Sequence, residues 1–194
     1  MGLLGINYWW IGGIGIGIVL IIILVCMFIS YYNRFVTGKN NVEESFSTMD
    51  THLKQRHDLI PNLVATVKGL IKNEKETLSS VIEARNLAAN STTLEDKIKN
   101  EAVLNNSLKG LACVVDKYPE LKEDSNFISL QQDLKNIENN IADARQFYNA
   151  RVKTFNNSIE GFPGVLFAKM YKFKKYSFYI VDAEQERKNI KVEF

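Results

Sequence analysis

The two histidines of the chain, His52 and His57, are its first candidates for chemistry. An imidazole that titrates near neutral pH can act as a general base or bind a metal ion. Their spacing of five residues places them on different helix faces, whereas helical metal ligands lie three or four residues apart. We therefore interpret both as surface or bundle-edge residues, and we expect no catalytic residue, no metal and no cofactor. A hydrolase that uses His52 or His57 is the least favoured alternative.

Three arginines lie at the edges of apolar stripes: Arg56, Arg85 and Arg145. A guanidinium near a bundle seam usually pairs with a carboxylate and fixes the register of the helices. The carboxylates that we expect as partners are Asp58, Glu83, Glu138 and Asp143. The arginines, Asp58 and Pro61 form our candidate set of register or interaction residues. The alternative is a polar groove that binds a partner or an anionic ligand.

Segment 164–181, GVLFAKMYKFKKYSFYIV, interleaves four lysines with aromatic residues and contains no acidic residue. This pattern suits an anionic lipid surface, where each basic residue contributes about 1 kcal/mol. Alternatively, the aromatic rings close the end of a bundle while the lysines stay in water. A third possibility is that the segment binds a protein or a single-stranded nucleic acid. The candidate membrane-surface residues are Lys169, Tyr171, Lys172, Phe173, Lys174 and Lys175. Because the net charge is only +2, we expect no nucleic acid partner.

Residues 1–33 contain no Lys, Arg, Asp or Glu, and Ile11–Ile29 is an apolar run of 19 residues. A helix of that length nearly crosses the ~30 Å hydrocarbon core of a bilayer. Aromatic residues of the kind that gather at membrane interfaces flank it: Trp9, Trp10, Tyr31 and Tyr32. A cleaved signal peptide would need a basic start, which this sequence does not have. We expect one uncleaved transmembrane helix that contacts membrane lipids through residues 11–29.

The charges that flank this span predict its orientation. Arg34 and Lys39 follow it and no basic side chain precedes it, so the positive-inside rule places the N-terminus outside and the rest of the chain in the cytoplasm. Within the span, Gly13 and Gly17 have the spacing that lets two membrane helices approach closely, which would give a homo-oligomer. Glycines are also common in membrane spans without such a role.

The remainder of the chain has the period of amphipathic helices. One apolar stripe runs from Phe46 to Leu87, and Asn90–Thr93 breaks it. Thr92 and Glu95 form a predicted capping box for the next helix, which YPEL at 118–121 ends. Asp124 or Ser125 can cap a last helix that continues to GFPG at 161–164 and is about 55 Å long.

Pro61 leaves the number of helices open. Asp58 can cap a new helix with Pro61 in its first turn, which gives four helices and returns segment 164–181 toward the membrane. Alternatively the helix continues through Pro61 with a kink and loses one hydrogen bond, which gives three helices. In both cases the fold class is all-α: a transmembrane helix followed by an antiparallel up-and-down bundle of long helices, four or three with a kinked first helix.

Six short segments occur in order after the predicted anchor: YNRFV (32–36), LKQRHDLIPNLVATVKG (53–69), EARN (83–86), YPELK (118–122), IENNIADARQFYN (137–149) and FPG (162–164). In these segments the chain resembles the LemA family over residues 31–173, and its most specific part is the run around Pro61. The resemblance implies a helical bundle behind one transmembrane helix in a bacterial cell membrane, with a short outward N-terminus. It implies no defined activity, and it leaves residues 180–194 uninterpreted.

These features predict three parts: an outside segment and transmembrane helix (1–33), a LemA-like bundle (34–163), and a basic-aromatic segment with a tail (164–194). The leading functional hypothesis is a non-catalytic, membrane-anchored scaffold that binds an unknown protein partner. The alternative is a membrane-organising or lipid-binding protein that acts through 164–181.

Overall fold

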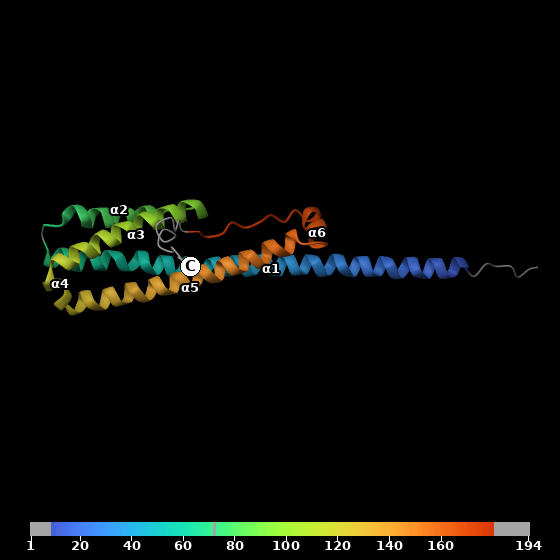
Figure 1. The fold of residues 1–194 in the computed structure, drawn as a ribbon, viewed down its shortest axis with the longest axis horizontal. Helices are drawn as coiled ribbons and strands as arrows, with labels where there is room; N and C mark the ends of the chain where they lie inside the picture. The colour runs from blue at the N-terminus through green and yellow to red at the C-terminus, as the bar shows by residue number, and fades with distance from the viewer. Residues whose placement is uncertain (1–8, 72, 181–194) are drawn as a thin grey trace, which may run out of the picture. The chain divides into compact units, whose positions relative to one another are not determined.

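The computed structural model describes residues 9–71 and 73–180, and the elements within them are helices (Figure 1). In chain order they are α1 (Trp9–Leu70), α2 (Lys75–Ala89), α3 (Leu94–Lys117), α4 (Pro119–Glu123), α5 (Ser125–Glu160) and α6 (Gly164–Met170). The predicted all-α antiparallel bundle is confirmed for this part of the chain. Three predicted features are not covered by the described residues. They are the N-terminal segment before residue 9, the side chains of Trp9 and Trp10, and the tail from residue 181.

The first half of α1 contains the apolar run. It is the one helix, among the described residues, that is long and apolar enough to cross a membrane, and the rest of the chain buries none of its most apolar stretch. Large side chains such as Ile16, Ile21 and Leu24 are more than half exposed. A row of exposed aliphatic side chains is unfavourable in water, so this helix suggests that the protein is anchored in a membrane.

Pro61 lies inside α1, and the helix continues through it for nine more residues. The predicted alternative in which Asp58 begins a new helix is therefore wrong. α1 ends instead at Leu70 and α2 begins at Lys75, so the described part of the chain has four long helices: α1, α2, α3 and α5. Ile71, just after α1, and Leu78, in α2, are both buried. Because the apolar spacing continues from α1 into α2, the periodicity predicted one helix where there are two.

Side-chain caps mark the starts of α3 and α5. The α3 cap is Thr93, whose hydroxyl oxygen accepts the Asp96 backbone N–H at 3.1 Å. The predicted Thr92 and Glu95 box was wrong by one residue, because Thr–Thr followed by Glu–Asp offers the same motif in two registers. The Asp124 carboxylate accepts the backbone N–H of Phe127 at 2.8 Å, as predicted for the start of α5. Pro119 begins α4 directly after Tyr118, where α3 ends.

The chain forms two compact units. One contains the chain up to Val42 together with Arg151–Tyr176, and the other contains Glu43–Ala150 with the chain from Ser177. The three-part division expected from the sequence stays a prediction.

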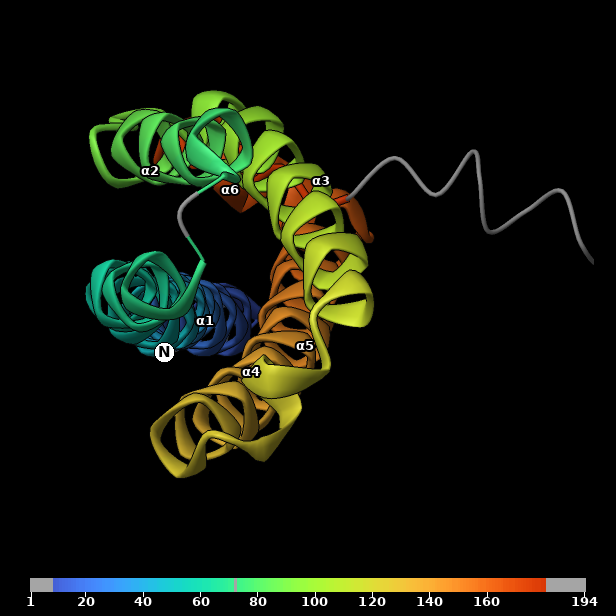
Figure 2. The same cartoon turned by 90° about the vertical axis from the view of Figure 1, so that its left-hand side faces the viewer.

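In the second unit, α2 packs along α3, and Figure 2 shows both beside the end of α1. The core lies between these helices and the start of α5. Its buried side chains are Ile60, Leu63, Val67, Leu78, Val81, Leu104, Leu111, Leu121 and Phe127. Fully buried aliphatic residues such as these each stabilise the fold by about 1.5–3 kcal/mol.

In the first unit, aromatic residues of α1 pack against α5, α6 and the chain after α6. Phe35 is fully buried, and its ring centre lies 5.4 Å from that of Phe173. The ring centre of Phe173 lies in turn 6.3 Å from that of Phe155. Gly38 allows this close packing, because a Cβ atom there would lie 2.9 Å from a ring carbon of Phe155. The aromatic pairs therefore hold the segment after α6 against α1 and α5.

Candidate functional site

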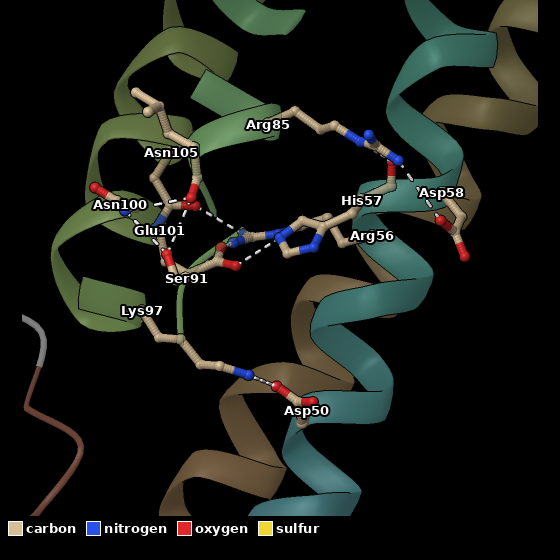
Figure 3. A network of polar contacts seen from close by, with 11 residues as sticks. Asp50, Arg56, His57, Asp58, Arg85, Ser91, Lys97, Asn100, Glu101 and Asn105 are labelled. Atoms are coloured by element: carbon tan, nitrogen blue, oxygen red, sulfur yellow. Dashed lines mark hydrogen bonds and ion pairs between the residues drawn. The ribbon is translucent and has the colours of Figure 1, made fainter. Parts of the chain in front are cut away.

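A buried layer of polar side chains crosses the core of the second unit (Figure 3). Arg56 on α1 and Glu101 on α3 are each 3% exposed, and Arg56 Nη2 forms an ion pair with Glu101 Oε2. Arg56 Nη1 also donates a hydrogen bond to Asn105 Oδ1 at 2.7 Å. A buried charge is tolerated only when it is paired and hydrogen-bonded. This pair therefore fixes which turn of α1 faces which turn of α3.

His57 completes this pair. Its Nε2 lies 2.6 Å from Glu101 Oε1, and the residue is only 8% exposed, so the prediction that it lies at the surface or bundle edge was wrong. Burial, together with the positive charges of Arg56 and Arg85, lowers the pKa of His57 to about 4. The imidazole is thus neutral at pH 7 and donates its Nε2–H to a carboxylate whose charge Arg56 already balances.

His52 faces away from this layer. It is half-buried, and its Nδ1 lies 3.0 Å from Gln55 Oε1 on the same helix. The two histidines therefore lie on different faces, as their spacing predicts. Among the described residues, no three His, Cys, Asp or Glu side chains gather in a way that could hold a metal ion.

The role of Pro61 follows from the backbone carbonyl four residues before it. In a regular α-helix, the N–H of residue 61 would donate to the carbonyl oxygen of His57, but proline has no N–H. That oxygen instead accepts a hydrogen bond from Arg85 Nε on α2, at 2.8 Å. The proline therefore opens an acceptor on α1, and the arginine of α2 fills it.

Arg85 makes two further contacts. Its Nη1 donates to Asn86 Oδ1 at 3.1 Å, and its Nη2 lies 3.6 Å from Asp58 Oδ1. Asp58 was an expected partner of the arginines, although its side chain is 62% exposed and such a pair contributes little. The hydrogen bond to the His57 carbonyl is thus the main polar link between α2 and the region around Pro61.

A second ion pair joins α1 to α3. Lys97 Nζ contacts Asp50 Oδ1, and the same ammonium lies 5.4 Å from the centre of the Phe46 ring. Nearby, Asn100 Nδ2 donates to Ser91 Oγ at 2.9 Å and to the carbonyl of Leu87 at 3.3 Å, which holds the turn between α2 and α3. Figure 3 shows the Lys97–Asp50 and Asn100–Ser91 contacts near Glu101.

Arg145, the third candidate arginine, lies half-buried on α5. Burial raises the pKa of the Tyr179 hydroxyl, and the charges of Arg56 and Arg145 counteract that rise. Burial lowers the pKa of Arg56, and the negative charge of Glu138 opposes this shift. Glu138 is one of the carboxylates that were expected as partners of the arginines. The buried layer therefore contains Arg56 and Arg85, and their main partners, Glu101 and the His57 carbonyl, were not predicted.

Two asparagines of α5 hold the extended chain after α6. Asn149 Oδ1 accepts the backbone N–H of Tyr179 at 2.8 Å, and its Nδ2 donates to the Tyr179 carbonyl at 3.0 Å. Asn156 makes the same pair of bonds with Tyr176, at 3.0 and 2.9 Å. Asn149 and Asn156 are seven residues apart on a helix, and Tyr176 and Tyr179 are three residues apart in extended chain. Both separations correspond to about 10 Å, so the two asparagines lie at the same spacing as the two backbone positions that they bind.

The candidate membrane-surface residues separate into two groups. Tyr171 and Phe173 are half-buried, with ring centres 5.0 and 6.4 Å from that of Tyr32. The four lysines are exposed, and Lys175 pairs with Glu160. In the apolar span, Gly13 and Gly17 have open space where a Cβ would lie, so helix–helix contact through them stays a prediction.

Sequence reasoning missed Glu101, Asn105, Asn149 and Asn156. A signal for Glu101 was available, because it occupies the stripe position between Ile98 and Leu104, where an apolar residue is expected. Arg56 fills the same kind of gap between Leu53 and Ile60. Two charged residues of opposite sign at core positions of two helices indicate a buried pair.

The fold and this layer define a class: helical-bundle proteins with one apolar helix suited to membrane anchoring. The model of the LemA family matches residues 45–194, so the chain belongs to the LemA family. Its curated relatives include magnetosome proteins MamQ 1 and MamQ 2 of Paramagnetospirillum magneticum, each 21% identical over 190 residues, covering 84% of this chain and 70% of theirs. MamQ of Magnetospirillum gryphiswaldense is 19% identical over 192 residues, covering 86% of this chain and 71% of its own.

We expect Glu101→Gln to destabilise the second unit by about 3–5 kcal/mol, because it leaves the buried Arg56 guanidinium without a counter-charge. Urea unfolding of the full chain in mild detergent, followed by circular dichroism, measures this loss. Glu95→Gln is the matched control on the same helix, where the side chain is exposed; its effect should stay within about 0.5 kcal/mol. Equal unfolding midpoints for the two variants would contradict the assigned role.

A double-mutant cycle tests the link between Pro61 and Arg85. Arg85→Met should cost about 1–3 kcal/mol in the natural chain, because it leaves the His57 carbonyl without a donor. In a Pro61→Ala background the new N–H bonds to that carbonyl, so the same change should cost less by at least about 0.5 kcal/mol. An additive cycle would show that Arg85 acts independently of Pro61.

Proposed function

We propose that this LemA-family chain is a single-pass membrane-anchored scaffold whose helical bundle binds a protein partner and catalyses no reaction. The observation that carries the proposal is the continuity of α1, which contributes both the apolar segment and the first helix of the bundle. The buried charged and polar groups support it, since Arg56 and His57 both bind Glu101 inside the core. A neutral, buried His57 is poorly suited to be the base of a hydrolase.

The bundle offers exposed polar surface for such a partner. The outer face of α5 carries exposed amide side chains, including Gln131, Gln132, Asn139 and Asn140. Between α2 and α3 lies a shallow groove lined by Ser80, Val103 and Asn106, among others. The relatives named as magnetosome proteins are consistent with a role at a membrane, but identities of 19–21% do not extend that organelle to this chain.

A second candidate function is membrane organisation through segment 164–181, together with self-association through Gly13 and Gly17. The observation that favours it is the exposure of Lys169, Lys172 and Lys174 beside the aromatic residues that pack on α1. In both candidates the N-terminus lies outside and the bundle lies in the cytoplasm of a bacterium, as Arg34 and Lys39 favour.

The exposed Cys113 on α3 provides a test of this orientation. In intact bacterial cells, a membrane-impermeant maleimide should leave it unlabelled, and labelling should appear once the inner membrane is permeabilised. Cys113→Ser is the control, since the only other cysteine, Cys26, lies in the apolar span. Full labelling of Cys113 in intact cells would reverse the proposed topology.

Photo-crosslinking in native membranes tests the scaffold. A photoreactive residue at Asn139 on α5 or at Asn106 on α3 should yield reproducible protein adducts, which mass spectrometry identifies. The same probe at Ile21 in the apolar span is the control for lipid and anchor neighbours. If Ile21 yields adducts while both bundle positions stay silent, the bundle has no stable protein partner and the proposal is wrong.

A further inference from the structure

α6 has two faces of different character. Toward α1, Phe167 and Ala168 are buried, and the Phe167 ring stacks on Tyr31 at 4.7 Å and meets Phe28 edge-on at 4.9 Å. On the exposed side of α6, Leu166 (59% exposed) and Met170 (50%) lie four residues apart, and Phe162 (85%), two residues before the helix begins, is exposed as well. We refer to these three residues as the α6 stripe.

The height of α6 along α1 is fixed by contacts within the first unit. The Phe167 ring contacts Phe28 and Tyr31, and the hydroxyl of Tyr171, just after α6, donates to the carbonyl oxygen of Phe28 at 3.5 Å. Phe28 belongs to the last turn of the apolar run, which ends at Ile29. Tyr31 and Tyr32 follow it, and the first charged residue is Arg34. α6 therefore lies beside α1 at the point where a membrane span passes into the headgroup region.

The charges around α6 suit the same place. Lys169, Lys172 and Lys174 are exposed, and no ion pair joins them to another residue in the described part of the chain, whereas Lys175 pairs with Glu160. Lysines beside an apolar face are typical of helices that lie in the membrane interface, where the stems cover apolar surface and the ammonium groups reach lipid phosphates. Segment 164–181 has no acidic side chain to oppose this.

We propose that α6 is an interfacial docking element: the α6 stripe inserts into the headgroup–acyl boundary, and Lys169, Lys172 and Lys174 contact anionic lipid headgroups. Phe167 packs directly on Phe28 in the last turn of the span, so the stripe lies at the level where the span ends. The proposal rests on the membrane anchoring in the proposed function, but not on the existence of a protein partner. It assigns lipid contact to Phe162, Leu166 and Met170, and it leaves Tyr171 and Phe173 to the packing against α1.

The element has a mechanical consequence. A single transmembrane helix is free to tilt and to turn about its axis, and interfacial anchors restrict both motions. A second amphipathic contact beside the exit point of α1 would oppose them. α6 would therefore limit the tilt of α1 at the membrane surface, and the lysines would make that restriction depend on lipid charge.

Spin-label accessibility in lipid nanodiscs tests this inference with the full chain. A nitroxide is attached at Leu166→Cys in a Cys26→Ser, Cys113→Ser background, and its collisions with oxygen and with a water-soluble nickel reagent are compared. The matched control is Leu87→Cys, because Leu87 on α2 is 56% exposed and thus closely resembles Leu166. In discs containing anionic phosphatidylglycerol, we expect several-fold fewer nickel collisions at position 166 than at position 87, with more oxygen collisions.

A second pair of labelled positions shows whether the result at position 166 is specific to that one label. Met170→Cys is compared with Ile128→Cys on α5, since these side chains are 50% and 48% exposed. If both α6 positions are as accessible to nickel as their controls, the inference is wrong. Replacement of Lys169, Lys172 and Lys174 by Gln should reduce the protection in anionic discs and leave it unchanged in purely zwitterionic discs; equal protection in the anionic discs would overturn the role of the lysines.

A label on the native Cys26, in a Cys113→Ser chain, separates this inference from the anchoring on which it rests. Cys26 lies within the apolar run and should be protected from nickel in every disc. A protected Cys26 with accessible α6 positions would overturn only the docking of α6. An accessible Cys26 would overturn the anchoring and the docking together.

Discussion

The buried ion pair between Arg56 and Glu101 is the contact on which the arrangement of the bundle depends. Apolar side chains pack in several registers at similar cost, whereas a charge buried in the wrong register loses several kcal/mol. Because Arg56 must meet Glu101, and Glu101 must also accept the hydrogen bond from His57, α1 and α3 fit together in one register. Asn105 satisfies a further Arg56 N–H, so the pair is both charge-balanced and hydrogen-bonded.

Pro61 extends this constraint to α2. A proline inside a helix usually only weakens it, because one hydrogen bond is lost and the chain bends. Here the freed carbonyl of His57 accepts Arg85 from the neighbouring helix, so a local defect becomes a contact between helices. Residues 56, 57 and 61 thus connect α1 to α3 and α2 within two turns. The segment around Pro61, in which the resemblance to the LemA family is most specific, therefore has a structural explanation. No catalytic role is needed to account for it.

Much of the fold was predictable because its signals are local. The apolar run, the start of α5 at Asp124 and the break at Tyr118–Pro119 each depend on a few neighbouring residues. The predictions failed where equivalent local signals compete or continue. The cap of α3 moved from Thr92 to Thr93, since both registers offer the same motif. The division between α1 and α2 was not predicted because buried residues in both helices keep the helical spacing.

The sequence by itself determined the helical class and the position of the apolar helix, and it singled out Arg56 and Arg85 as arginines that would pair, because hydropathy and periodicity act over a few turns. Only the tertiary structure decided their partners. Glu101 lies 45 residues from Arg56, and the acceptor for Arg85 is a backbone carbonyl that no side-chain pattern reveals. Likewise, the apolar side chains of the α6 stripe are exposed because α6 buries Phe167 against Tyr31, a contact between distant parts of the chain. Which side chains become paired or exposed depends on which helices become neighbours, and that is a long-range property of the packed chain.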